Sequence, residues 1–99
     1  MEVYVENNVT GQGKWIPLPQ PPKALQECLD RNNLTSDGEY QLSYIRGELI
    51  YMQQCVGNLF LLNQKLFRYL KLSPKMQSEI VDCAYDEGIS FEEALYEYV

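Results

Sequence analysis

The side chains of this sequence best able to do chemistry are seven carboxylates gathered in residues 79–99. That stretch contains no Lys, Arg or His, whereas residues 1–78 carry seven acids and eight bases. The net charge of −6 therefore comes from one end of the chain. The seven acids are Glu79, Asp82, Asp86, Glu87, Glu92, Glu93 and Glu97.

Helical spacing would place these carboxylates on solvent-facing stripes. Glu79, Asp82 and Asp86 are spaced i, i+3, i+7, so on an α-helix they lie within about 60° of one another. Glu93 and Glu97 are spaced i, i+4, with Glu92 beside them. Steps of roughly 4.5–6 Å along a helix axis are comparable to the phosphate spacing of a DNA strand. Such a surface can occupy a DNA-binding groove lined by Lys and Arg of another protein.

The ordinary alternative is a solvated helix face. Glu92 and Glu93 in a first helical turn complement the helix dipole, but like charges at i, i+4 repel one another. A stripe selected for stability alone would mix signs. The basic stripe of Lys65, Arg68, Lys71 and Lys75 could neutralise part of the acidic tail through pairs between helices, and the sequence leaves that alternative open.

Other chemistry finds little support in the residue types. The chain has no His, which removes Ser-His-Asp and Cys-His catalysis and the commonest metal ligand. No phosphate-binding glycine motif is present. Cys28, Cys55 and Cys83 are widely spaced and odd in number, which predicts free thiols. We expect no enzyme activity, cofactor or metal site, and the negative charge argues against binding nucleic acid.

The first half of the chain predicts a small antiparallel sheet with one helix. EVYVE at 2–6 alternates apolar and polar residues, KWIPL at 14–18 could pair back, and EYQLSYIR at 39–46 is the clearest strand. We expect Tyr40, Leu42 and Tyr44 to face one way. LIYMQQC at 49–55 is a fourth strand or an extended exit, and Pro22 suits the first turn of a helix over about 22–33.

After Gly57 the apolar period becomes helical. The first of three helices places Leu59, Leu62, Leu66 and Leu70 on one face. Ser73 is a predicted N-cap for a second helix that ends at Glu87 before Gly88. Ser90 to Glu93 forms a capping box for a third, in which Phe91, Ala94, Leu95 and Tyr98 face inward. The predicted fold is α+β, with an α+β subdomain at 1–54 and a three-helix subdomain at 55–99.

Location follows from hydropathy. No apolar run approaches the ~20 residues that span a bilayer, and MEVYVENN has neither the basic nor the apolar region of a signal peptide. We therefore expect a cytoplasmic protein.

The order of motifs resembles the ArdA-type antirestriction proteins of plasmids, phages and conjugative transposons. VYVENN…GKWIPLP is similar to their opening strand, turn and Gly-x-Trp segment, and DGEYQLSYIRGE occupies the place of their Glu-Tyr strand. LFLLNQKLFRYLKLSPKMQSEI and GISFEEALYEY are similar to their successive helices. Arg46 and Gly47 stand where members of that family have acids, and the family's proteins are longer than this chain.

The resemblance implies a non-enzymatic, acidic protein, a possible homodimer, that imitates DNA and blocks a type I restriction-modification enzyme. Each of the seven acids would then stand for a phosphate opposite a Lys or Arg. The alternative is an adaptor of a mobile element that binds another protein through an apolar patch, for which aromatic residues are suited. Its candidate residues are Tyr44, Tyr51, Tyr96 and Tyr98.

Overall fold

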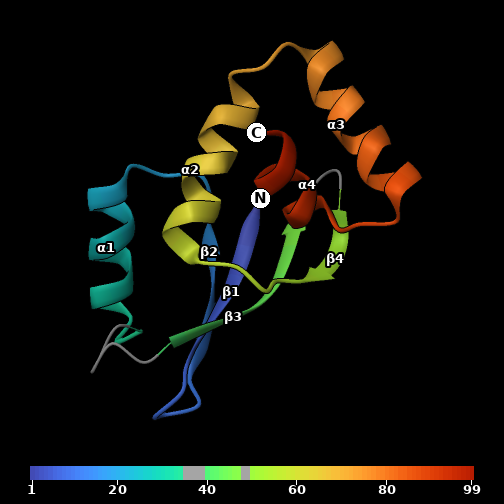
Figure 1. Ribbon diagram of the computed structural model, residues 1–99. Helices are drawn as coiled ribbons and strands as arrows, with labels where there is room; N and C mark the ends of the chain where they lie inside the picture. Colours follow the sequence, from blue (N-terminus) through green and yellow to red (C-terminus); the bar gives the residue numbers. More distant parts are fainter. Residues whose placement is uncertain (35–39, 48–49) are drawn as a thin grey trace. The chain divides into compact units, whose positions relative to one another are not determined.

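The computed structural model describes residues 1–34, 40–47 and 50–99 (Figure 1). It divides into two compact units, Met1–Val56 and Gly57–Val99. The sequence placed the boundary between residues 54 and 55. Gly47 and Glu48, where the sequence predicts a turn between the third and fourth expected strands, lie partly outside the described residues.

The first unit is built on a four-stranded antiparallel sheet in the order β2-β1-β3-β4. Its strands are β1 (Glu2–Asn7), β2 (Gly13–Pro17), β3 (Tyr40–Gly47) and β4 (Ile50–Gln54). Val3, Val5 and Asn7 alternate with half-buried residues along β1, as a strand with one face in the core requires. The sheet and the four helices among the described residues confirm the predicted α+β class.

Helix α1 (Pro22–Arg31) completes the first unit (Figure 1). Pro22 begins it, where a missing N–H costs nothing, and Leu25 and Leu29 are fully buried. A buried polar side chain joins the helix end to the sheet, because the Asn7 amide donates to the Asn33 carbonyl at 2.6 Å. The Asn7 side-chain oxygen accepts the Val9 and Thr10 N–H groups and thereby fixes the turn after β1.

The expectation that Tyr40, Leu42 and Tyr44 share one face is wrong for Tyr44. The register of β3 on β1 shifts by one residue, so that Leu42 lies opposite Val5 whereas Tyr44 lies opposite Tyr4. Directly opposed residues point to the same side of a sheet, and Val5 and Tyr4 point to opposite sides. The irregularity therefore turns Tyr44 to the other face.

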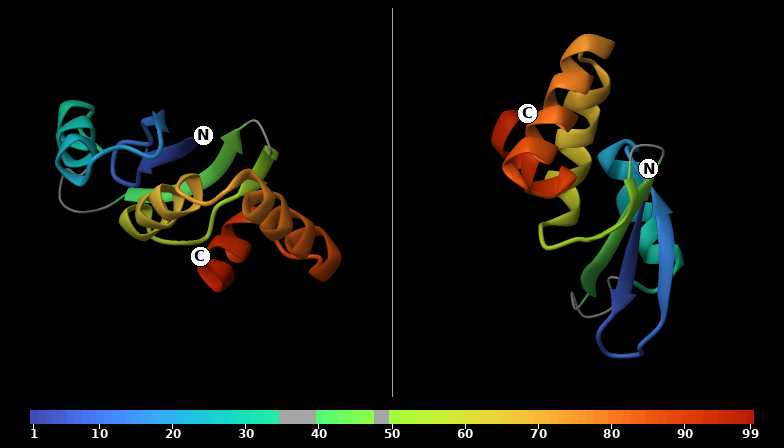
Figure 2. Two further views of the ribbon diagram at one scale, coloured as in Figure 1. Left: turned by 90° about the horizontal axis from the view of Figure 1, so that it is seen from above. Right: turned by 90° about the vertical axis from the view of Figure 1, so that its right-hand side faces the viewer.

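The second unit is a group of three helices, α2 (Leu59–Leu70), α3 (Pro74–Glu87) and α4 (Phe91–Tyr98), in which α4 contacts both others (Figure 2). Each helix begins with a side-chain cap. Asn58 accepts the Phe60 and Leu61 N–H groups, Ser73 accepts that of Met76, and Ser90 accepts that of Glu93. Gly88 ends α3 in the left-handed conformation, with φ of 68°. The predicted start and end of α3 and the predicted start of α4 are confirmed.

The core of this unit differs from the predicted apolar stripe at two helix ends. Leu59, Leu62 and Leu66 are buried, but Leu70 is the last residue of α2 and is 52% exposed. Tyr69 is buried in its place, with its ring edge-to-face against Phe91 at 5.2 Å between centroids. Tyr98, the last residue of α4, is also more exposed than expected, at 41%.

The Tyr69 hydroxyl is buried and has no hydrogen-bond partner among the described residues, and burial raises the pKa of Tyr69. We predict that Tyr69→Phe leaves stability unchanged or raises it by about 1 kcal/mol, because an unbonded buried hydroxyl carries a desolvation cost. Tyr96→Phe is the matched control, since the Tyr96 hydroxyl donates to Glu92 at 2.6 Å. That control should lose about 1–3 kcal/mol. Urea unfolding measures the free energy of unfolding of both variants. An equal loss of stability in the two would contradict the conclusion that the Tyr69 hydroxyl is unbonded.

Candidate functional site

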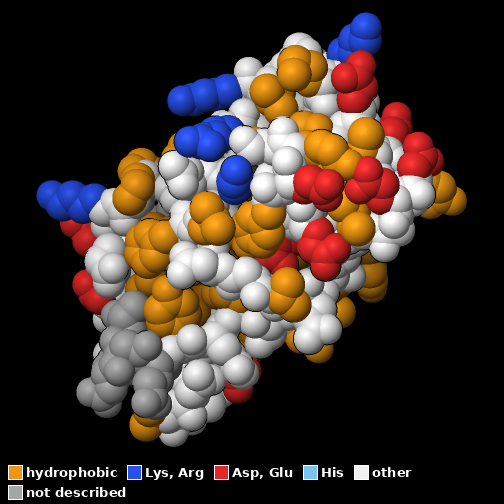
Figure 3. Space-filling view, viewed as in Figure 1, with side chains coloured by type: hydrophobic (Ala, Val, Ile, Leu, Met, Phe, Trp, Pro, Cys, Tyr) orange, Lys and Arg blue, Asp and Glu red, His pale blue; other side chains and the backbone are white. Residues whose placement is uncertain are grey.

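Six of the seven predicted acids lie at the surface of α3 and α4 and are here called the acidic face. In Figure 3 acidic side chains gather over these two helices. Glu79, Asp82, Asp86 and Glu87 come from α3, and Glu93 and Glu97 come from α4. The spacing that the sequence predicted for α3 is therefore realised on one helix from Pro74 to Glu87.

The acidic face is not neutralised by the cations of the chain. Within residues 1–34, 40–47 and 50–99, none of its six carboxylates forms an ion pair with a Lys or Arg. Lys65, Arg68, Lys71 and Lys75 form none either, so the interhelix pairing left open by the sequence does not occur. The carboxylates thus keep their charge available to a partner.

Glu92 is the exception, and its assignment to the surface is wrong. Its side chain is fully buried, at 0% exposure. Its Oε2 accepts the Gly57 N–H at 2.9 Å and the Tyr96 hydroxyl at 2.6 Å. Glu92 follows Phe91 at the start of α4 and shares the buried side of that helix with Leu95. A clue in the sequence was Tyr96 at i+4, a hydroxyl donor on the same helical face.

Glu87 forms no ion pair with any residue that the structure describes, but it has a hydrogen-bond partner within the second unit. The Tyr98 hydroxyl donates a hydrogen bond to its Oε1. That bond is the main reason why the pKa of Tyr98 rises from 10.0 to about 12. Desolvation and the negative charges of Glu87 and Glu97 contribute further. The contact ties the end of α4 to the end of α3 across the acidic face.

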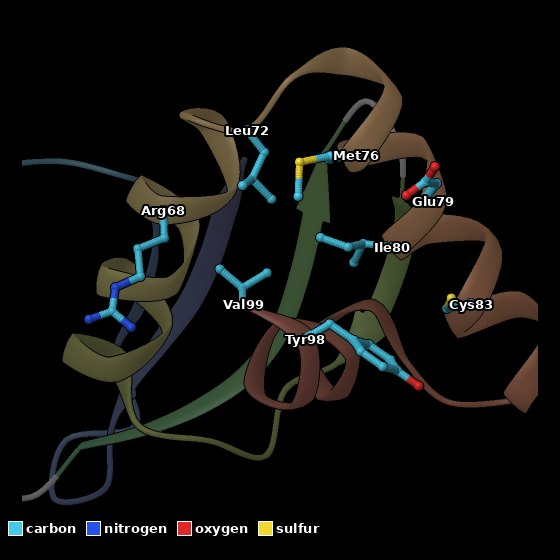
Figure 4. Close-up of a pocket in the computed structure, with 8 residues that line it drawn as sticks. All are labelled: Arg68, Leu72, Met76, Glu79, Ile80, Cys83, Tyr98 and Val99. Atoms are coloured by element: carbon cyan, nitrogen blue, oxygen red, sulfur yellow. The ribbon is translucent and has the colours of Figure 1, made fainter.

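A pocket of about 400 Å³ opens beside the acidic face, within the second unit (Figure 4). Gln77 joins α3 to the end of α2, because its side-chain amide donates hydrogen bonds to the Tyr69 and Leu72 carbonyls at 3.2 and 3.1 Å. Met76, Ile80 and Cys83 line the pocket from α3, and no pattern in the sequence predicted it. Its lining residues are Arg68, Leu72, Met76, Glu79, Ile80, Cys83, Tyr98 and Val99.

The sheet carries a second cluster that the sequence analysis missed. The Arg46 guanidinium lies 3.8 Å from the centroid of the Trp15 ring and 3.1 Å from a Glu2 carboxylate oxygen. Tyr4 meets Trp15 edge-to-face at 5.3 Å between centroids. Arg46 and Trp15 come from strands that each pair with β1, a relation visible only once the strand order is known. Because Glu2 compensates Arg46, this cluster presents no unpaired cation.

The tyrosines considered for an adaptor differ in accessibility. Tyr51 is 96% exposed on the edge strand β4, and Tyr44 is also exposed. Tyr96 is half-buried and bonded to Glu92. Tyr98 lines the pocket.

The described residues contain no group of three or more Cys, Asp or Glu side chains placed to hold a metal ion. No helix among them has the length and apolar character needed to cross a membrane.

Comparisons with known proteins add no relative. No protein family, curated protein or solved structure matches the chain. The resemblance to ArdA-type proteins therefore rests on the motifs in the sequence.

We predict that Glu87→Gln lowers the pKa of Tyr98 from about 12 toward 10.0. The folded protein holds the Tyr98 proton more tightly than the unfolded chain does. Its contribution to stability is therefore present below pH 10.0 and is lost as pH rises through about 12. The chemical shift of the ring carbon bearing the hydroxyl, followed by NMR, reports the titration.

Glu97→Gln is the control for that experiment, because it removes the same charge without removing the hydrogen bond. It should shift the Tyr98 pKa less than Glu87→Gln does. Equal shifts in the two variants would mean that charge alone raises the pKa.

Proposed function

We propose that this protein is a non-enzymatic inhibitor that binds the cationic DNA site of another protein through its acidic face. The observation that carries the proposal is the set of six exposed carboxylates that form no ion pair within the described part of the chain. Surface charges of one sign attract a protein of opposite charge and accelerate its association. A DNA-binding groove, whose Lys and Arg side chains otherwise meet phosphates, is the fitting partner.

The spacing of the acids supports DNA mimicry over simple polyanion behaviour. Glu79, Asp82 and Asp86 follow one another along α3 in steps of about 4.5–6 Å. Those steps are comparable to the spacing of phosphates along a DNA strand. The Ser90 cap and the Gly88 turn fix the start of α4, so Glu93 and Glu97 are carried on a defined helix. A rigid array of charges has less entropy to lose on binding than a flexible acidic tail.

The resemblance to ArdA-type proteins suggests the kind of target. Proteins of that family imitate DNA and block type I restriction-modification enzymes, and we propose such an enzyme as the partner here. The proposed activity requires no catalytic residue, cofactor or metal ion. Occupation of the DNA site suffices to protect incoming DNA.

The test is binding to a type I restriction-modification enzyme at several salt concentrations. We predict that the triple variant Glu79→Lys, Asp82→Lys, Asp86→Lys binds at least about a hundredfold more weakly, since each reversal replaces an attraction by a repulsion. Binding by the unaltered protein should weaken steeply with salt, because exposed charges are screened. Titration calorimetry measures the affinity, and a DNA-cleavage assay measures the protection.

The matched control reverses three acids of the first unit, Glu6, Glu27 and Asp30, which changes the net charge equally. This control should keep most of the affinity, and circular dichroism should show both variants folded. Equal losses in the two triple variants would reduce the effect to net charge. Unchanged affinity in the α3 variant would contradict the proposal.

The second candidate function is an adaptor that binds another protein through apolar contacts. It is favoured by Tyr51, which is 96% exposed on the edge strand β4. Binding that is insensitive to salt and is lost in Tyr51→Ala would support the adaptor and exclude the mimic.

A further inference from the structure

The pocket beside the acidic face has the chemistry of an anchor site for an apolar side chain. Met76, Ile80 and Cys83 are spaced i, i+4, i+7 and line it from one side of α3. Leu72, Tyr98 and Val99 line it from the other elements, and Figure 4 shows these side chains directed toward a common space. Met76 is 49% exposed. A pocket of about 400 Å³ holds one or two large apolar side chains of a partner.

The pocket has an acidic side chain on its α3 side and a basic side chain on the opposite wall. Glu79 both lines the pocket and belongs to the acidic face. The row of Glu79, Asp82 and Asp86 lies roughly 90° around α3 from the apolar row of Met76, Ile80 and Cys83. Arg68 lines the opposite wall, with its guanidinium turned away from the other lining residues (Figure 4). A segment laid along α3 therefore meets apolar side chains and anions side by side.

The pocket and the acidic face are also joined physically. The Tyr98 ring lines the pocket while its hydroxyl donates to Glu87 of the acidic face. The same hydrogen bond thus holds one wall of the pocket and the position of one acid. A partner that contacts the acids is brought to the pocket edge.

We propose that the pocket receives an apolar side chain from a cationic amphipathic helix of the protein target, whose Lys and Arg side chains face Glu79, Asp82 and Asp86. This proposal rests on the proposed function and adds to it an apolar contact, which the charges alone do not supply. DNA offers no apolar side chain for such a pocket, so the mimic would bind its target through a contact that DNA does not make. Apolar anchors flanked by charge are the usual centres of binding energy in protein interfaces.

The test uses two synthetic helical peptides of about 18 residues. One carries Leu at i, i+3, i+4 and i+7 with Lys elsewhere, and the other has every Leu replaced by Ala at the same charge. We expect the Leu/Lys peptide to bind at least about tenfold more tightly, because burying even one Leu side chain is worth that much. Fluorescence anisotropy of labelled peptides measures both dissociation constants at matched salt.

The variant that tests the site is Cys83→Trp, which fills the pocket from an exposed position. Tyr85→Trp is its control, since Tyr85 is an exposed residue of α3 outside the pocket. Cys83→Trp should abolish the preference for the Leu/Lys peptide and leave the Ala/Lys affinity unchanged. Tyr85→Trp should retain the preference. Alkylation of Cys83, read by mass spectrometry, should slow when the Leu/Lys peptide is bound.

Three outcomes would overturn the proposal. The first is equal affinity for the two peptides, and the second is equal behaviour of Cys83→Trp and Tyr85→Trp. The third is a dimer in light scattering that Cys83→Trp converts to a monomer, which would assign the pocket to a second copy of the chain. Failure of the proposed function looks different, because there the Glu79, Asp82, Asp86 triple variant keeps its full affinity for the restriction-modification enzyme.

Discussion

The arrangement of the second unit depends on the hydrogen bonds that the buried Glu92 carboxylate accepts from Gly57 and Tyr96. Burying a carboxylate is costly unless its oxygens accept hydrogen bonds, and here Gly57 and Tyr96 both donate to Oε2. Gly57 fits because a Cβ there would lie 2.6 Å from that oxygen and would overlap the Tyr96 phenol. Glu92 thereby holds α4 to the segment that leads into α2. With α4 fixed in this way, Glu93 and Glu97 are left at the surface.

The charge asymmetry of the sequence takes a different form once the units are known. Each unit, Met1–Val56 and Gly57–Val99, contains seven acids and four bases, so the two carry equal net charge. Acidic and basic residues are unevenly distributed inside the second unit. Its four bases are Lys65 and Arg68 on α2, Lys71 just after α2, and Lys75 in the first turn of α3, and its acids lie beyond them along the chain (Figure 3). The contrast along the chain is therefore a contrast between α2 with the first turn of α3 and the rest of α3 with α4.

Local signals in the sequence were sufficient to predict the helices and strands, but not the contacts between them. The caps at Ser73 and Ser90 and the glycine at 88 act within a few residues, so the limits of α3 and α4 were predictable. The facing of Tyr44 depends on an irregular pairing with β1, about forty residues away in the chain. Burial of Glu92 depends on Gly57, and exposure of Leu70 on the packing of Tyr69 against Phe91. Such distant partners leave no periodic trace in the sequence.

In the proposed recognition, the row of acids and the apolar pocket have different roles. The acids would attract the target, and the pocket would discriminate between targets. Exposed carboxylates act at a distance and raise the rate of encounter with a cationic protein, but salt screens them and many cationic surfaces would satisfy them. An apolar contact acts only after docking, and it discriminates by shape. Because Glu79 belongs to both features and the Tyr98–Glu87 bond joins them, a target of the proposed kind would have to match the two together. Selectivity among DNA-binding proteins would then come from the residue that enters the pocket, whereas the charges that all such proteins recognise would supply the attraction.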